Sequence, residues 1–182
     1  MIVWMLAPPP GDSLDACIAR IAQGDQDALG QLYHRTRPAV YGFALSILKN
    51  PHDAEDALHD TYLQVWGAAG GYRSQGKPMA WLLTVVRNLC MDILRRRSRT
   101  ESLSGAEGCF EDRPAVTQED RMLLRALLEA LGDEERQVVT LHALGGLKHR
   151  ETAELLGLPL ATVLSKYSRA LKKLNAAWKE AT

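Results

Sequence analysis

Apolar side chains recur every three or four residues along most of this chain, and that spacing constrains its fold more than any other feature. No segment shows the strict alternation of apolar and polar residues that is typical of a half-buried strand. The pattern therefore predicts an all-α protein. In the helix predicted over residues 50–66, the inward stripe consists of Ala54, Leu58, Thr61 and Val65.

Capping residues divide this periodicity into separate helices. Asp12 or Ser13 is the expected N-cap of the first helix, and Asn50, followed by a proline, opens the helix over 50–66. Pro38 is expected to bend or divide the long helix between them, because proline removes a backbone donor and crowds the preceding turn.

The charges of the chain sum to zero but are sorted along the sequence. The helix over 50–66 carries four carboxylates and no lysine or arginine, whereas residues 87–99 hold five arginines. Residues 148–179 hold seven lysines and arginines against two glutamates. Such basic segments can bind phosphates, although cations near a helix C-terminus also offset the helix dipole.

A helix-turn-helix is the most specific local signal. Ala153 is small where two helices would cross, Gly157 stands at the turn, and Val163 is apolar where the second helix packs back. On that second helix, over 160–178, Tyr167 and other apolar residues face inward. The opposite face carries Thr162, Ser165, Lys166, Arg169 and Lys173.

A glycine-rich loop is predicted over 67–78, before a helix that begins near residue 79 and runs into the arginines. Tyr72 and Arg73 in this loop, with Lys77, form an aromatic and cationic set that suits single-stranded nucleic acid. Trp81 is assigned to the core rather than to base stacking.

Four segments follow from these patterns: an N-terminal extension over 1–11, a helical domain over 12–99, an acidic flexible linker over 100–117, and a second small helical domain over 118–182 that holds the helix-turn-helix. In the second domain, Gly132 is the expected C-cap of one helix and Asp133 the N-cap of the next.

Cellular location and thiol chemistry are read from what the sequence lacks. No apolar run is long enough to span a membrane and the start has no basic region, so we expect no membrane insertion and a cytoplasmic protein. Cys17, Cys90 and Cys109 are odd in number and widely spaced, which favours reduced thiols over a disulfide framework or a zinc site.

Three ordered stretches resemble the extracytoplasmic-function sigma factors of bacteria: DAEDALHDTYLQVW, GYRSQGKPMAWLLTVVRNLCMDILRRRSR and GLKHRETAELLGLPLATVLSKYSRALKKL. The resemblance spans about residues 12–178. It implies a promoter-specific initiation factor that binds core RNA polymerase, is no enzyme, and uses no catalytic residue, cofactor or metal. It also implies a possible anti-sigma partner.

The resemblance assigns roles to both domains. The first would be domain two, which docks on the β′ clamp helices through Asp53, Asp56, Asp60 and Leu63. Its promoter contacts, at the minus-ten element, would be Tyr72, Arg73, Arg87, Asn88, Arg95 and Arg96. The second would be domain four, which touches the β flap and reads the minus-thirty-five element with Ser165, Lys166 and Arg169, while Thr162 and Lys173 lie nearer the phosphates.

Acidic charge on a polymerase-binding helix has a physical reason, since it discourages phosphate and favours a basic partner. Asp60 lies too far along the helix to be explained by the dipole. Three positions depart from the family pattern: Leu164 stands where lysine is common, and His59 and Asp60 replace glutamine and glutamate.

Two alternatives come from other classes. A helix-turn-helix regulator acting without polymerase would leave the acidic and arginine-rich helices unexplained. A metal enzyme would need a second helix that repeats the ligand types of the first, and none is evident. The candidate ligands would be His52, Asp53, Glu55, Asp56, His59 and Asp60.

Overall fold

The computed structural model describes residues 13–100 and 130–180, and every regular element in these ranges is helical. The predicted all-α class is therefore confirmed. In chain order the elements are α1 (Leu14–Ile21), α2 (Gln26–Leu48), α3 (Pro51–Ala68), the 3-10 helix η2 (Ala69–Gly71), α4 (Pro78–Thr100), α6 (Asp133–Val139), the π-helix η3 (Thr140–Leu144), α7 (His149–Leu156) and α8 (Leu160–Glu180).

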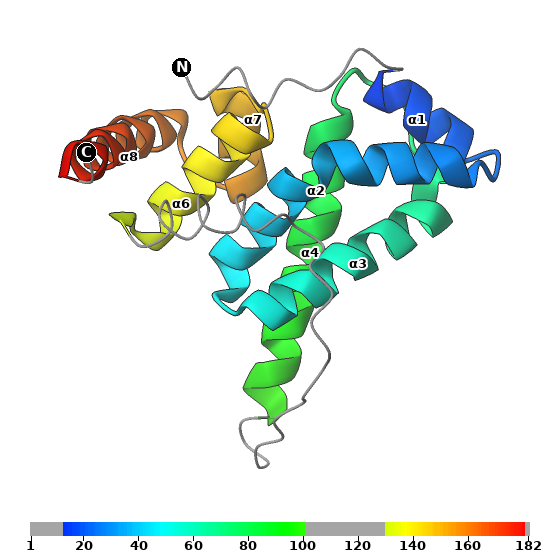
Figure 1. Cartoon of the computed structure of the whole chain (residues 1–182), viewed down its shortest axis with the longest axis horizontal. Coiled ribbons are helices and arrows are strands. Elements are labelled where there is room, and N and C mark those ends of the chain that lie inside the picture. The colour runs from blue at the N-terminus through cyan, green and yellow to red at the C-terminus, as the bar shows by residue number, and fades with distance from the viewer. Residues whose placement is uncertain (1–12, 101–129, 181–182) are drawn as a thin grey trace.

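The helix ends mostly follow the capping pattern. Ser13 caps α1, with its hydroxyl accepting from the Ala16 amide at 3.1 Å. Asn50 caps α3 through its side-chain oxygen, which accepts from the amides of the first turn. Pro38 lies inside α2, which continues through it and so is not divided; the two halves of α2 run in different directions (Figure 1).

Helices α1 to α4 enclose the main hydrophobic core, in which Phe43 is fully buried. The inward stripe predicted for α3 is confirmed, because all four of its side chains are completely buried. The predicted loop is shorter than expected. Its first two residues complete α3, and η2 follows, so the irregular segment comprises residues 72–77.

The predicted helix-turn-helix is confirmed. Gly157 ends α7 in the left-handed region at φ 66°, where a side chain would be strained. Ala153 and Val163 pack together with Val138 of α6 in a small core of their own. The predicted N-cap of α6 is wrong by one residue: Gly132 is the N-cap, and Asp133 is the first helical residue. The helix that Gly132 was expected to end lies mostly outside the described residues.

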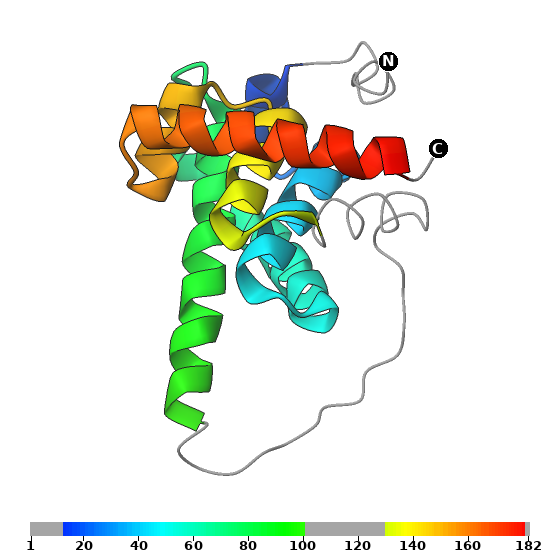
Figure 2. The same cartoon turned by 90° about the vertical axis from the view of Figure 1, so that its left-hand side faces the viewer.

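The helix-turn-helix half packs against the first half. Leu141 and Leu147 are buried in the same cluster as the residues of α1 to α4. Helix α6 and η3 lie against α2, and α7 lies against α4 (Figures 1 and 2). The approach is close, because a Cβ added at Gly145 would lie 2.9 Å from Cδ1 of Leu83 on α4.

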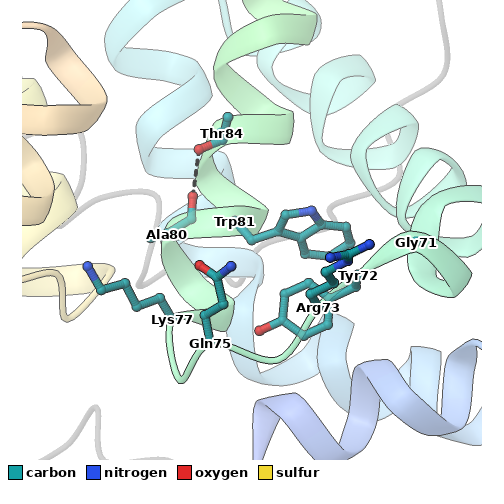
Figure 3. Close-up of a pocket in the computed structure, with 8 residues that line it drawn as sticks. All are labelled: Gly71, Tyr72, Arg73, Gln75, Lys77, Ala80, Trp81 and Thr84. Carbon is teal, nitrogen blue, oxygen red and sulfur yellow. Dashed lines mark hydrogen bonds between the residues drawn. The ribbon is translucent and has the colours of Figure 1, made fainter.

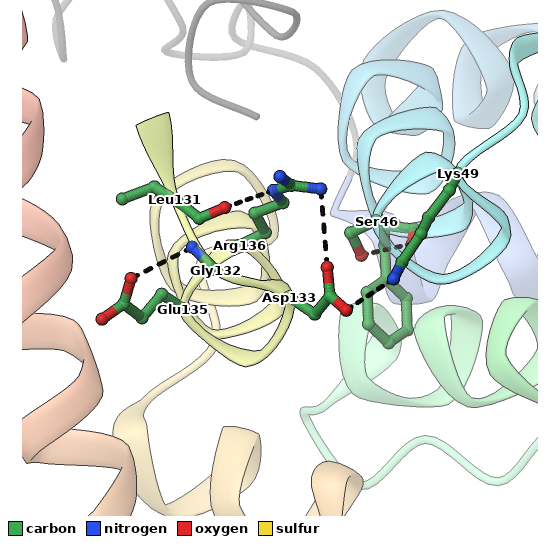
Figure 4. A network of polar contacts seen from close by, with 8 residues as sticks. Ser46, Lys49, Leu131, Gly132, Asp133, Glu135 and Arg136 are labelled. Atoms are coloured by element: carbon green, nitrogen blue, oxygen red, sulfur yellow. Dashed lines mark hydrogen bonds and ion pairs between the residues drawn. The ribbon is translucent and has the colours of Figure 1, made fainter. Parts of the chain in front are cut away.

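A polar network ties the end of α2 to the start of α6 (Figure 4). The Lys49 ammonium donates to Asp133 Oδ2 at 2.5 Å, and Asp133 also pairs with Arg136 one turn later. Lys49 itself caps α2 at φ 57°. The Lys49 ammonium holds the pKa of the Asp133 carboxyl below its ordinary value.

Several expectations fall outside the described residues: the N-terminal extension, the acidic linker beyond Thr100, the start of the second domain and Cys109. Within the described ranges, no helix combines the length and apolar character needed to cross a bilayer. Cys17 and Cys90 are buried free thiols.

Candidate functional surfaces

One face of α3 presents acidic and apolar side chains together. Asp56, Asp60 and Leu63 all lie on the exposed side of the helix, opposite its buried stripe. Leu63 is 71% exposed, and Trp66, one turn further on, is 38% exposed. Trp66 was missed by the sequence reasoning, although its spacing of three from Leu63 was the available signal. We call this set the acidic face.

Asp53 does not belong to the acidic face in this structure. It lies in the first turn of α3, its side chain is 20% exposed, and it forms an ion pair with Arg97 of α4. The pair joins the acidic helix to the arginine-rich helix, so Asp53 has a structural role that the sequence pattern did not indicate.

The loop after η2 forms one wall of a cavity of about 410 Å³ (Figure 3). The Tyr72 and Trp81 rings lie 4.8 Å apart, centroid to centroid, at 51°. Trp81 packs against the core, as expected, and also lines the cavity. The lining residues are Gly71, Tyr72, Arg73, Gln75, Lys77, Ala80, Trp81 and Thr84, and we call this cavity the aromatic pocket.

The basic groups of α4 lie in two places. Arg87 is half-buried beside a second cavity, whose other wall carries Glu151 and Glu154 of α7. Asn88, Arg95 and Arg96 are exposed further along the helix. Arg95 pairs with Asp92 of the same helix at 3.0 Å, an exposed contact that is weak in water.

The outward face of α8 is only partly open. Ser165 and Arg169 are exposed, whereas Thr162 is half-buried. Lys166 is ion-paired with Glu134 of α6, and its side chain is only 16% exposed. Lys173 donates to Glu135 at 2.7 Å. These carboxylates belong to the acidic first turn of α6.

Glu135 links α6 to α8 through its ion pair with Lys173. Its carboxylate accepts from the Gly132 amide at 3.1 Å as well as from Lys173. The hydrogen bond from Lys173 is the main reason that the pKa of Glu135 lies below its ordinary value. Glu135 therefore stays charged at neutral pH and keeps Lys173 paired.

The residues proposed as metal ligands are spread over separate contacts. His59 Nδ1 lies 2.8 Å from the Glu55 carbonyl oxygen, and Asp53 is paired with Arg97. Within residues 13–100 and 130–180, no three histidine, cysteine or acidic side chains are grouped so as to hold a metal ion.

Sequence families cover both halves of the chain. Residues 32–100 match Sigma-70 region 2, and residues 121–174 match Sigma-70, region 4. The ECF RNA polymerase sigma factor SigK of Mycobacterium ulcerans (strain Agy99) is 32% identical over 178 residues, which are 92% of this chain and 95% of that protein. SigK of Mycobacterium sp. (strain KMS) is 34% identical over 173 residues, 89% of each chain.

Two solved structures resemble this chain in fold. The structure of CnrH in complex with the cytosolic domain of CnrY matches with a TM-score of 0.58 and 26% identity, over 94% of this chain and 100% of that one. The sigma factor RpoE from Bartonella quintana, in complex with the anti-sigma factor NepR, matches with a TM-score of 0.57 and 24% identity. That match covers 78% of this chain and 91% of RpoE, and supports the fold alone.

Proposed function

Because this chain belongs to the extracytoplasmic-function RNA polymerase sigma factors and directs transcription initiation with RNA polymerase, we propose that it divides polymerase binding and promoter recognition between separate surfaces. The proposed units are domain two, over residues 12–99, and domain four, over 118–182. The acidic face serves the polymerase, while the aromatic pocket, α4 and α8 serve DNA.

The acidic face is the proposed docking surface for the β′ clamp helices. Leu63 offers an apolar anchor at 71% exposure, and Asp56 and Asp60 flank it with negative charge. Burying an exposed leucine contributes about 1.5–3 kcal/mol, and the carboxylates favour a basic partner over phosphate. Asp53 contributes through the helix position that its pair with Arg97 fixes.

The aromatic pocket is the proposed site for an unpaired base of the minus-ten element. Aromatic rings give a base a stacking surface, and the pocket adds the cations Arg73 and Lys77 for the neighbouring phosphates. Arg87, Asn88, Arg95 and Arg96 continue the contact along α4. The free energy that opens the duplex then comes from binding, and the chain needs no catalytic residue, cofactor or metal.

Helix α8 is the proposed reader of the minus-thirty-five element. Ser165 and Arg169 are open to solvent, whereas Lys166 and Lys173 must exchange α6 carboxylates for DNA. Thr162 lies near the start of the helix, where its hydroxyl suits a phosphate. The same half is proposed to touch the β flap.

An anti-sigma factor is a proposed further partner, because both solved relatives were captured with a second protein. CnrH was solved with the cytosolic domain of CnrY, and RpoE with the anti-sigma factor NepR. The proposed place of action is the cytoplasm, where RNA polymerase meets chromosomal DNA.

The observation that carries this proposal is the acidic face, which a DNA-binding regulator acting alone would not need. The test is titration of purified chain into core RNA polymerase, followed by selection of genomic fragments with and without core. We expect tight association with core and fragment selection that depends on it. Equal fragment selection by the chain alone, with no core binding, would identify a stand-alone regulator instead.

A further inference from the structure

We propose that Asp15 is a positioning residue for minus-ten recognition: it fixes the loop of residues 72–77 so that Arg73 and the Tyr72 ring form the wall of the aromatic pocket. This inference rests on the proposed function of that pocket. Asp15 itself does not line the pocket and acts only through the loop.

One carboxylate oxygen of Asp15 holds two residues of the loop. Asp15 Oδ1 accepts from the Tyr72 hydroxyl at 2.6 Å and from the Ser74 hydroxyl at 2.9 Å. Hydrogen bonds to a charged acceptor are about twice as strong as neutral ones. These two bonds therefore anchor the loop on both sides of Arg73.

Asp15 is held in a fixed position by the packing of α1. Asp15 lies in the first turn of α1, where the helix dipole favours a carboxylate. The following residues of α1, Cys17, Ile18 and Ile21, are at most 2% exposed and belong to the main core. The position of Asp15 is thus fixed by packing rather than by the loop.

The two bonds restrain the backbone from which Arg73 extends. Tyr72 has an extended conformation, with φ −66° and ψ 129°, and Arg73 lies between it and Ser74, the two residues that are bonded to α1. Arg73 itself lines the pocket (Figure 3).

Other contacts hold the two ends of the loop: the Tyr72 ring contacts Trp81, and Lys77 pairs with Glu151. Between them, Gly76 has φ 69°, a conformation that glycine adopts more readily than other residues. The Tyr72 hydroxyl remains a donor at neutral pH, because burial and the bond to Asp15 both raise its pKa. Without Asp15, residues 73–76 would be less restrained.

The test uses full-length chain bound to core polymerase. The probe is a promoter fragment library with a pre-opened bubble whose unpaired strand is randomised, alongside a randomised double-stranded upstream element. Retained fragments are sequenced, and base discrimination is the enrichment ratio of the most to the least favoured base at each position. Core affinity and melting temperature are measured for every variant.

We expect Asp15→Ala to lower discrimination about tenfold at the unpaired position held by the pocket, because the change removes both hydrogen bonds that hold the loop to α1. Discrimination in the double-stranded element should be unchanged. Asp15→Asn keeps an acceptor oxygen and should restore most of the loss. Asp27→Ala, an exposed first-turn carboxylate of α2, is the matched control and should behave as wild type.

Tyr72→Phe keeps the ring but removes the donor, so it provides a second route should Asp15→Ala fail to fold. It should reproduce the loss, and combining it with Asp15→Asn should add little, because both changes act on one contact. Wild-type discrimination in both Asp15→Ala and Tyr72→Phe would overturn the inference. A loss spread equally over both elements would overturn it too, by showing a purely structural role. If the wild-type holoenzyme selects no base in the unpaired strand, the proposed pocket function itself fails, and this inference with it.

Discussion

At the scale of single residues, the proposed DNA contact of Lys166 competes with an ion pair inside the protein. It lies on the predicted reading face of α8, yet it is ion-paired with Glu134 and its side chain is mostly covered. Contacting a base or phosphate requires breaking that pair. If Lys166 contacts DNA as proposed, Glu134 imposes a free-energy cost on promoter binding, and that cost is small because the Glu134 side chain is 56% exposed.

Substitutions of Glu134 and of Lys166 should have opposite effects on promoter affinity. We expect Glu134→Gln to tighten holoenzyme binding to its promoter about two- to fivefold, the range of a surface ion pair. Lys166→Ala should weaken binding by about 1–3 kcal/mol if the lysine contacts a base. Fluorescence anisotropy of labelled promoter measures both.

The control for this pair is Asp27→Asn, which alters an exposed first-turn carboxylate of α2. Its promoter affinity should match wild type, and Glu134→Gln should give no gain in the Lys166→Ala background. Tighter binding in that background would show that Glu134 acts by another route.

His149 should make the helix-turn-helix sensitive to mild acid. Its ring stacks on His142 at 4.1 Å and lies 4.9 Å from the Tyr167 ring. Burial, and then the neighbouring His142, lowers the pKa of His149 from its ordinary 6.5. Below about pH 6.5, His149 therefore binds a proton in the unfolded chain more readily than in the folded chain. The free energy of unfolding decreases as the pH is lowered.

Thermal unfolding between about pH 7.5 and 5.5 tests this sign. The melting temperature of wild type should decline as the pH falls, and His149→Phe, which keeps a ring in the stack, should flatten the decline. His52→Gln, a change at an exposed histidine, should keep the wild-type slope. An unchanged slope in His149→Phe would remove His149 as the cause.

At the scale of elements, α3 and α4 carry opposite charge on surfaces for which we propose different partners. We expect Asp56→Lys with Asp60→Lys to abolish association with core polymerase, because both side chains are exposed on the acidic face. Circular dichroism should show an intact fold, since neither residue is in the buried stripe.

The matching change on α4 is Arg95→Ala with Arg96→Ala. Core binding should persist, while open-complex formation should fall, and the advantage of wild type should shrink as salt rises, since phosphate contacts release counterions. Normal core binding by the acidic-face variant, or its loss in the arginine variant, would contradict this division of labour.

Features set by local spacing were predictable from the sequence, and features set by tertiary packing were not. The α3 stripe and the turn at Gly157 depend on residues within one or two helical turns, so a pattern reveals them. Asp15 and Tyr72 are 57 residues apart, and no local signal joins them. The N-cap error at Asp133 has a physical cause, because its carboxylate is turned to Lys49 and Arg136 instead of the helix amides.

At the scale of the whole molecule, the two halves pack directly against each other. Nζ of Lys77, the residue before α4, lies 3.6 Å from Oε1 of Glu151 on α7. Leu141 of the second half is buried in the core of the first half. The two elements are named for positions about 25 base pairs apart, or roughly 85 Å along the duplex axis. We therefore expect the halves to separate when the holoenzyme binds its promoter.

Energy transfer between two dyes measures this separation. Labels at Gln23→Cys and Asn175→Cys, both exposed positions on different halves, should give high transfer in the free chain and low transfer in the promoter complex. Cys109→Ser prevents labelling at that thiol, and Cys17 and Cys90 are buried. High transfer in a transcriptionally active complex would show that the halves stay together.

Site-specific cross-linking can show whether one face of the first half meets polymerase while another meets DNA. A photo-reactive benzoylphenylalanine replaces Leu63 in one variant and Arg73 in another, and each is assembled with core polymerase and a labelled promoter. We expect position 63 to cross-link to the β′ subunit and position 73 to cross-link to promoter DNA. A DNA cross-link from position 63, or a polymerase cross-link without DNA from position 73, would contradict it.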